Sequence, residues 1–207
     1  MALGTVIRSF ATPAGGARGI TFDGRYLWHG DIGTDLIYQI DPETGTVIRS
    51  FAFAALNPVG MAWDGRTLWA ASGTTNRIYQ IDPATGTVIR SFAAPAAAAL
   101  GLTFDGRTLW HTDTTTGLIY QIDPETGTVI RSFAGPGNDP YGLAFDGRTL
   151  WLVDYTLELI YQIDPETGTV IRSTATPGSN SIGLTFDGRT LFHTDFGTNL
   201  IYQIDIG

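Results

Sequence analysis

A fixed period of 41 residues constrains this chain more than any other feature of its sequence. The segment Gly-Thr-Val-Ile-Arg-Ser begins at Gly4, Gly45, Gly86, Gly127 and Gly168, so that successive copies start 41 residues apart. Five such periods account for nearly all of the 207 residues. A period in the forties, with one supersecondary unit in each repeat, is typical of propellers and similar arrays.

The first complete copy of the repeat reads as four short strands joined by turns. We expect strands at 19–22, 25–30, 36–40 and 46–51. Asp23-Gly24 predicts a two-residue type I′ hairpin, a turn that needs positive φ at both central positions. The segment DPETG at 41–45 predicts a second turn, since Pro presets φ and Gly takes the left-handed position. An eight-residue link, 52–59, then leads to the next copy.

Four antiparallel strands rich in β-branched and aromatic residues describe the blade of a β-propeller. The chain opens on a fourth strand, 5–10, and stops after a third strand, 200–204. We therefore predict an all-β, five-bladed β-propeller of four-stranded antiparallel blades, with residues 1–207 as a single domain. Pairing of the N-terminal strand with the C-terminal blade would close the ring and remove two open sheet edges. A β-solenoid is the alternative for such a period, but its coils do not need Asp-Gly hairpins.

Charge and composition exclude several classes of partner. Twelve basic residues, all Arg, stand against twenty acids and give a net charge of −8. Phosphate binding needs concentrated positive charge, so we expect neither nucleic acid nor membrane as a partner. We recognise no signal peptide, no run approaching the roughly 18 apolar residues of a membrane span and no Cys. The expectation is a soluble monomer without a cofactor, cytoplasmic if expressed recombinantly.

The repeated motifs PxGLxFDGRTLWHTD and IYQIDPETGTVIRSF resemble the NHL, streptogramin-lyase and glutamine-cyclotransferase group of propellers. In the cyclotransferases, this resemblance implies a catalytic Glu after the aromatic residue of the second strand, with an assisting Lys. The lyases imply a pair of His, a Glu and a divalent metal. This chain has no Lys, and its one Glu outside the repeated turn is Glu158. The column that would hold the catalytic Glu contains His29, Ala70, His111, Leu152 and His193. Neither activity carries over, because a shared fold implies none by itself.

The five copies differ in length nowhere, which is unusual for exposed loops that tolerate insertions. Agreement of turn chemistry, pattern and length in every copy indicates an idealised sequence. We interpret the chain as a designed or consensus-derived propeller, with a recently amplified natural gene as the alternative.

Variation between the copies is concentrated in two kinds of loop, which we expect on one face of the disc. These are the connections between second and third strands and the links from one copy to the next; together we call their surface the variable face. It carries seven acids and two bases, Arg18 and Arg77, and so would attract cations. It also holds apolar residues that we expect to be exposed: Ile32, Phe53, Leu56, Tyr141, Tyr155, Leu157 and Phe196. The candidate ligand-binding residues are Arg18, His29, Asp31, Arg77, His111, Asp113, Tyr141, Asp154, Tyr155, Glu158, His193, Asp195 and Phe196.

The three His residues all occupy the second-strand column, and each has an Asp two residues later. Strand alternation places each His and its Asp on one side of a blade. Imidazoles beside carboxylates suit zinc, but a metal would need three different blades to converge. The competing interpretation is a local His–Asp hydrogen bond that fixes the strand end.

The sequence thus predicts a scaffold whose variable face binds a small or cationic ligand, with no catalytic residues and no metal ligands assigned. Two alternatives stay open. One is a metal-dependent, His-based lyase or hydrolase, and the other is a purely structural scaffold without a ligand.

Overall fold

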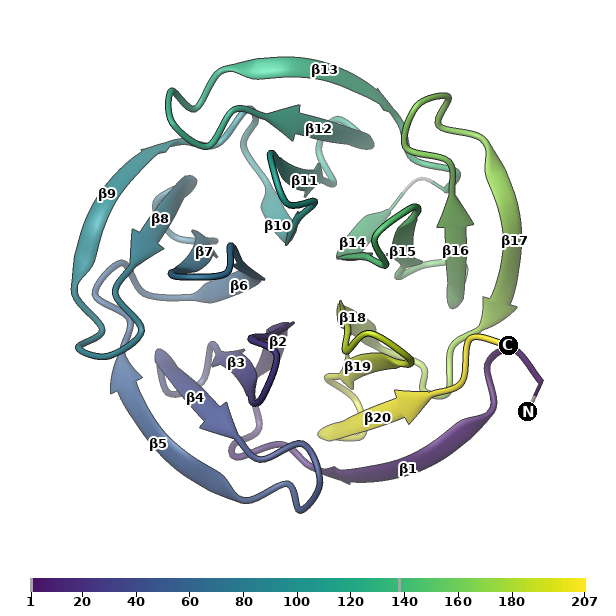
Figure 1. Ribbon diagram of the computed structural model, residues 1–207, viewed down its shortest axis with the longest axis horizontal. Helices are drawn as coiled ribbons and strands as arrows, with labels where there is room; N and C mark the ends of the chain where they lie inside the picture. Colours follow the sequence, from purple (N-terminus) through teal and green to yellow (C-terminus); the bar gives the residue numbers. More distant parts are fainter. Residues whose placement is uncertain (1, 138) are drawn as a thin grey trace.

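The computed structural model describes residues 2–137 and 139–207; Met1 and Asn138, the latter within a variable link, lie outside it. In the described residues, twenty strands form five four-stranded antiparallel sheets, arranged as blades around an axis (Figure 1). The predicted five-bladed β-propeller is confirmed. The described residues include no helix long and apolar enough to span a bilayer.

The blades follow chain order, from the axis outward. Blade 1 contains β2 (Ala17–Phe22), β3 (Leu27–Asp31), β4 (Leu36–Ile40) and β5 (Val47–Ala52). Blade 2 contains β6 (Pro58–Trp63), β7 (Leu68–Ser72), β8 (Arg77–Ile81) and β9 (Val88–Ala93). Blade 3 contains β10 (Ala99–Phe104), β11 (Leu109–Asp113), β12 (Leu118–Ile122) and β13 (Val129–Ala134). Blade 4 contains β14 (Pro140–Phe145), β15 (Leu150–Asp154), β16 (Leu159–Ile163) and β17 (Val170–Ala175). Blade 5 contains β18 (Ser181–Phe186), β19 (Leu191–Asp195), β20 (Leu200–Ile204) and β1 (Val6–Ala11).

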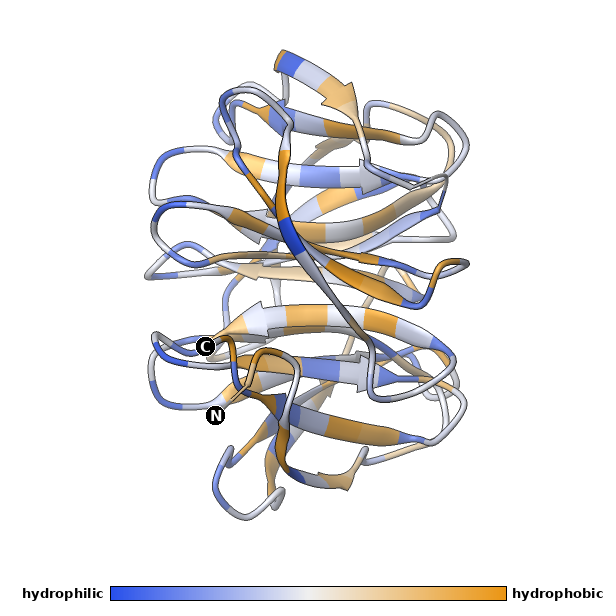
Figure 2. Cartoon of the chain, turned by 90° about the vertical axis from the view of Figure 1, so that its right-hand side faces the viewer, coloured by the Kyte–Doolittle hydropathy of each residue, from blue (hydrophilic) through white to orange (hydrophobic). Residues whose placement is uncertain are grey.

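The fifth blade is shared between the two ends of the chain, as predicted. β1 pairs antiparallel with β20, with Ser9 opposite Tyr202. The two ends of the described part of the chain lie close together on one side of the disc (Figure 2). There the backbone N–H of Gly4 donates to the carbonyl of Asp205 at 2.9 Å, which reproduces the bond from Gly45 to Asp41 inside an unbroken turn. The break in the chain therefore keeps the hydrogen bonding of the turn that it interrupts.

The first turn of each blade differs from the predicted two-residue type I′ hairpin. Phe22 pairs directly with Leu27, so the loop has four residues, and Gly24 has a φ of 95° whereas Asp23 does not have positive φ. The Asp23 carboxylate instead accepts the backbone N–H groups of Arg25 and Tyr26 at 2.8 and 2.6 Å. An Asx-type turn has replaced the second left-handed residue, because the side chain supplies the acceptor.

The core lies between neighbouring blades. Trp69 of β7 is about 1% exposed and packs in one cluster with Leu102 and Ile122 of the next blade. Its indole N–H donates to the Asp64 carboxylate at 2.8 Å, and the Arg90 guanidinium lies 5.4 Å from its ring centre. Trp28, Trp110 and Trp151 are equally buried in the other clusters between blades, so the Trp residues of the second strands fill the spaces between blades.

The axis is closed by a column of glycines in the innermost strands. A Cβ at Gly60, Gly101 or Gly142 would overlap a backbone carbonyl oxygen of the next blade. These glycines therefore allow the inner strands to approach one another closely. The space along the axis is about 10 Å³, which is at the lower limit for one water molecule. No ligand can pass through this channel.

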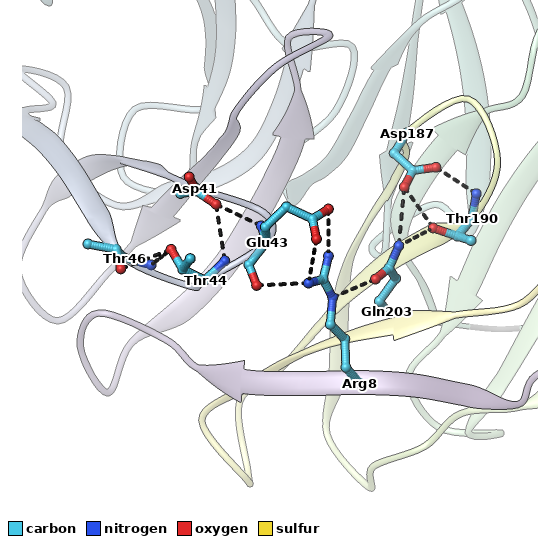
Figure 3. Close-up of polar contacts among 8 residues, drawn as sticks. All are labelled: Arg8, Asp41, Glu43, Thr44, Thr46, Asp187, Thr190 and Gln203. Atoms are coloured by element: carbon cyan, nitrogen blue, oxygen red, sulfur yellow. Dashed lines mark hydrogen bonds and ion pairs between the residues drawn. The ribbon is translucent and has the colours of Figure 1, made fainter.

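Polar side chains join the blades on the face opposite the variable face (Figure 3). Arg8 donates from Nε to Gln203 of its own blade at 2.7 Å, and from Nη1 to the Glu43 carboxylate of the next blade at 3.0 Å. The same ion pair recurs in Arg90–Glu125 and Arg131–Glu166. Because each Glu is more than three-quarters exposed, each pair contributes little, on the order of 0–1 kcal/mol.

Candidate ligand-binding face

The two kinds of variable loop meet on one face, as predicted, and bond to each other. The backbone N–H of Ile32 donates to the carbonyl of Gly16 at 2.9 Å, and that of Phe196 donates to the carbonyl of Asn180 at 2.9 Å. Backbone bonds of this kind hold the connections of blades 1, 2, 4 and 5 against the links that enter those blades.

Four acids of the variable face are structural. Asp31, at 0% exposure, accepts backbone N–H groups from Gly16 at 2.7 Å and from Thr34 at 2.9 Å. Asp113, Asp154 and Asp195 are equally buried and accept N–H groups from the same two kinds of loop. These carboxylates tie loops to strand ends and do not point outward as ligands for a cation.

The three predicted His residues are buried, and their rings do not bond to the neighbouring Asp. His111 Nδ1 lies 3.0 Å from the carbonyl oxygen of Gly101, and His29 and His193 make the same contact with Gly19 and Gly183. A carbonyl can only accept, so Nδ1 carries the proton. The Nε2 atoms of all three rings are buried without a partner among the described residues. The expected His–Asp hydrogen bond is therefore wrong, since each Asp is occupied by backbone N–H groups.

Burial controls the chemistry of these imidazoles. The loss of solvation lowers the pKa of His111 to about 4, against smaller opposing effects of the Gly101 carbonyl and Asp113. Burial likewise lowers the pKa of His29 and His193 to about 4. Within residues 2–137 and 139–207, no group of three or more His, Cys, Asp or Glu side chains is placed to hold a metal ion. The geometry gives the metal-dependent alternative no support.

Arg18 and three aromatic residues come together on the variable face, close to the axis of the propeller. The Arg18 guanidinium lies 4.5 Å from the ring centre of Phe196, on the neighbouring fifth blade. Tyr141 stacks on Tyr155 with ring centres 4.9 Å apart, and the Tyr155 hydroxyl donates to Asn180 at 2.8 Å. Burial lowers the pKa of Arg18, while Tyr141, Tyr155 and Asp31 oppose this effect. Burial, with a contribution from Asp139, raises the pKa of Tyr141, so its hydroxyl is protonated at neutral pH.

A hollow of about 310 Å³ opens beside this cluster. Arg18, Ile32, Asn57 and Tyr141 line it, together with the alanine-rich link Ala97–Leu100. Its walls come from blades 1 to 4, so several different loops build it. Its volume is at the lower end of the range for pockets that bind small molecules.

Other predicted residues lie apart from the hollow or in supporting roles. Arg77 donates to Ser91 on the neighbouring strand at 3.0 Å, and Glu158 is an exposed loop residue with a φ of 54°. Phe53, predicted to be exposed, is 2% exposed and packs in the cluster of Trp28 and Met61. Its ring makes an edge contact with Tyr79 of the second blade, with ring centres 5.5 Å apart.

Sequence reasoning missed Asn57. This residue has a φ of 53°, lines the hollow, and its Oδ1 is buried without a hydrogen-bond partner among the described residues. Its place in an otherwise apolar link, ALNPVG, was the available signal. The glycines at the axis were missed as well, although Gly19, Gly60, Gly101, Gly142 and Gly183 recur at the repeat period.

Three larger hollows, of about 370, 430 and 490 Å³, lie among the turns on the opposite face. Their polar side chains largely bond to one another. Arg90 pairs with Glu125 at 2.9 Å, and Gln80 donates to Thr67 at 2.8 Å. Since these residues belong to the repeat that builds every blade, we interpret these hollows as spaces between copies of the scaffold.

Residues 3–104 match DUF6923, described as a repeat of unknown function. No curated protein matches the chain in sequence. Three solved structures similar to this chain share 14–19% of its sequence.

Glutaminyl cyclase of Myxococcus xanthus aligns with a TM-score of 0.83 at 15% identity, covering 99% of this chain and 97% of that one. The Cps50 (Swd1) β-propeller domain of Myceliophteria thermophila aligns with a TM-score of 0.63 at 14% identity, over 99% and 100% of the two chains. Virginiamycin B lyase of Staphylococcus aureus gives 0.59 at 19% identity, over 96% of this chain and 69% of that one. At these identities the likeness shows the fold alone.

Proposed function

We propose that this protein binds a small molecule on its variable face, in the hollow at the end of the closed axis. The observation that carries the proposal is the hollow itself, about 310 Å³ and lined by loops of four blades. A rigid scaffold that presents divergent loops is the usual arrangement of a binding surface. The closed axis supports the same view, because a ligand on this face would rest on the strand ends and could not enter a channel.

We also propose that the uniform blades form an idealised or consensus-derived scaffold that carries this face. The equal lengths of all five copies support this proposal. The structure adds that the same Asp–loop and Arg–turn contacts recur from blade to blade. Stability is thus supplied by the repeat, which leaves the loop side chains at the hollow free to differ.

The test is a fragment screen by ligand-observed NMR, with neutral, cationic and anionic members. Ala97 is exposed and lines the hollow, so Ala97→Trp fills it, whereas Ala84→Trp places the same side chain on an exposed turn of the opposite face. We expect the screen to find fragments that bind both the parent and the Ala84→Trp variant but do not bind Ala97→Trp. A screen without such fragments would contradict the proposal.

A further inference from the structure

The hollow contains a cation that the protein itself leaves unpaired. Among the described residues, the Arg18 guanidinium donates one hydrogen bond, from Nη1 to the carbonyl of Ala17 at 3.2 Å, and forms no ion pair within 4.0 Å. A guanidinium has five N–H donors, and a half-buried one loses much of its contact with water. Most of its capacity to donate is therefore unused.

Other arginines that contact a neighbouring blade or strand are satisfied in a way that Arg18 is not. Arg131 pairs with Glu166 at 3.1 Å, and Arg49 donates to the backbone oxygens of Pro83 and Ala84. Arg77, the second base of the variable face, donates twice to Ser91 Oγ and once to its carbonyl. Arg18 is held instead by packing, with its guanidinium over the ring of Phe196. The stacking fixes the plane of the group while leaving its edge available.

The surroundings supply a second donor and an apolar wall. The Tyr141 hydroxyl has no hydrogen-bond partner among the described residues, and Tyr141 lines the same hollow as Arg18. Ile32, Val59 and the Ala97–Leu100 link cover the apolar part of the hollow. Five of the seven acids of this face accept backbone N–H groups within the described residues: Asp31, Asp35, Asp113, Asp154 and Asp195.

We propose that Arg18 and Tyr141 bind the carboxylate of a small organic acid whose aromatic or aliphatic body fills the hollow. This proposal rests on the proposed function and names its ligand class. A planar guanidinium donates two parallel N–H groups to a carboxylate, which is a geometry that neither a neutral amide nor a cation can use. It differs from the expectation of a cationic ligand drawn from net charge, because in the described part of the chain the residues that line the hollow include the Arg18 guanidinium and no Asp or Glu.

The test uses three probes that share one ring and differ in charge: benzoate, benzamide and benzamidine. Each is titrated by NMR against the parent, Arg18→Gln, Arg18→Lys and Tyr141→Phe, with Arg77→Gln as a control of equal net charge. We expect benzoate to bind most tightly, Arg18→Gln to weaken it roughly 10- to 100-fold, and Arg18→Lys to retain part of the affinity. Tyr141→Phe should weaken it severalfold, and Arg77→Gln should leave it unchanged. The melting temperature of each variant establishes that it is folded. If Arg18→Gln is not folded, Arg18→Lys takes its place in the comparison with the parent.

The outcomes separate the two proposals. Benzamide or benzamidine binding at least as tightly as benzoate, or benzoate indifferent to Arg18→Gln, would overturn the carboxylate assignment and leave the hollow as a site. If none of the three probes binds, while library fragments bind the parent and are excluded by Ala97→Trp, the carboxylate assignment is overturned as well. Failure of the probes and of the library together would overturn both proposals.

Discussion

The Thr194 hydroxyl donates to the backbone carbonyl of Arg18 at 2.6 Å and so connects the last blade to the first. The Thr194 hydroxyl oxygen also accepts the backbone N–H of Gly183 at 2.8 Å. Thr112 makes the equivalent pair of bonds to Tyr141 and Gly101, between blades 3 and 4. The two residues at the proposed carboxylate site are therefore each held through their backbone by a Thr of the preceding blade.

Thr194→Val should destabilise the protein by about 1–2 kcal/mol. The shape is tolerated, since the corresponding residue of blade 4 is the fully buried Val153, but the Arg18 carbonyl and Gly183 N–H lose a partner. Urea unfolding measures the difference. Thr115→Val, at an exposed loop residue, is the matched control and should change stability by less than about 0.5 kcal/mol. Equal effects of the two substitutions would show that the bond between the blades contributes nothing.

Gly60→Ala should destabilise the protein by about 1–3 kcal/mol or more, because the added methyl overlaps the carbonyl oxygen of Leu100 and backbone must move. Gly15→Ala is the control: its Cβ would meet one atom within 4 Å, the Asn199 side-chain oxygen at 4.0 Å, and its φ is not positive. Thermal unfolding of both variants distinguishes a crowded axis from a general cost of replacing glycine. A Gly60→Ala protein as stable as Gly15→Ala would mean that the inner strands have room to spare.

Much of the fold follows from the sequence because it depends on local chemistry that the period repeats. The strands at 36–40 and 200–204 were placed at their observed bounds, and the shared fifth blade follows from where the chain begins and ends. The predicted type I′ turn was wrong because the Asp23 carboxylate accepts two backbone N–H groups of the turn, so that Asp23 does not need positive φ. This alternative is available to Asp and cannot be distinguished by the dipeptide alone.

The candidate site could be predicted as a face but not as a set of contacts. The sequence placed Arg18, Tyr141, Tyr155 and Phe196 on the variable face, and the structure brings them together. From the sequence alone, Asp31 counts as available charge on this face, whereas the structure buries its carboxylate among backbone N–H groups. Which charges are already satisfied depends on tertiary hydrogen bonds, and composition carries no information about them.

The three buried His residues should make stability fall as pH falls from about 6.5 toward 4. Each ring has a pKa of about 4 when folded and about 6.5 when unfolded, so in this range the unfolded chain binds protons that the folded protein does not. Full stability is present above the unfolded pKa, and each His can cost up to roughly 3 kcal/mol by pH 4. Urea unfolding between pH 7 and pH 4 measures this slope.

His111→Leu should reduce that slope by about a third, because it removes one of three rings with the same lowered pKa. Leu should fit there, since Leu152 fills the corresponding buried position of blade 4. The substitution also removes a buried Nε2 without a partner, but it removes the Nδ1 donor to the Gly101 carbonyl too, so the two effects oppose each other at pH 7. The triple variant with Leu at 29, 111 and 193 should be nearly flat above pH 4.5. A slope that survives the triple substitution would assign the pH dependence to other groups.

A circular permutant tests the interrupted turn. Joining 205 to 4 through Pro-Glu-Thr restores the DPETG sequence, and new ends are cut between Glu125 and Thr126 in another exposed turn. Because the Gly4–Asp205 bond already has the geometry of the Gly45–Asp41 bond, we expect the permutant to fold with little change in melting temperature. Deletion of residues 1–10 is the contrasting variant. It leaves β20 as an open edge and should lower the melting temperature by many degrees; survival of the deletion at the parental temperature would contradict closure by β1.

Ala84→Glu should complete a blade contact that lacks its acid although its turn is unbroken; Arg172, which donates to the Ile206 carbonyl in the interrupted turn, lacks one as well. Arg49 faces the turn of blade 2, where Ala replaces the Glu found opposite Arg8, Arg90 and Arg131, and donates instead to backbone oxygens. The new carboxylate should stabilise the protein by about 0.2–1 kcal/mol at low salt, as expected for exposed pairs. The gain should shrink in 1 M NaCl, where the Debye length falls to about 3 Å. In the double variant Arg49→Gln with Ala84→Glu, the gain should disappear; a gain that persists there, or that does not respond to salt, would assign the effect to the turn and not to the pair.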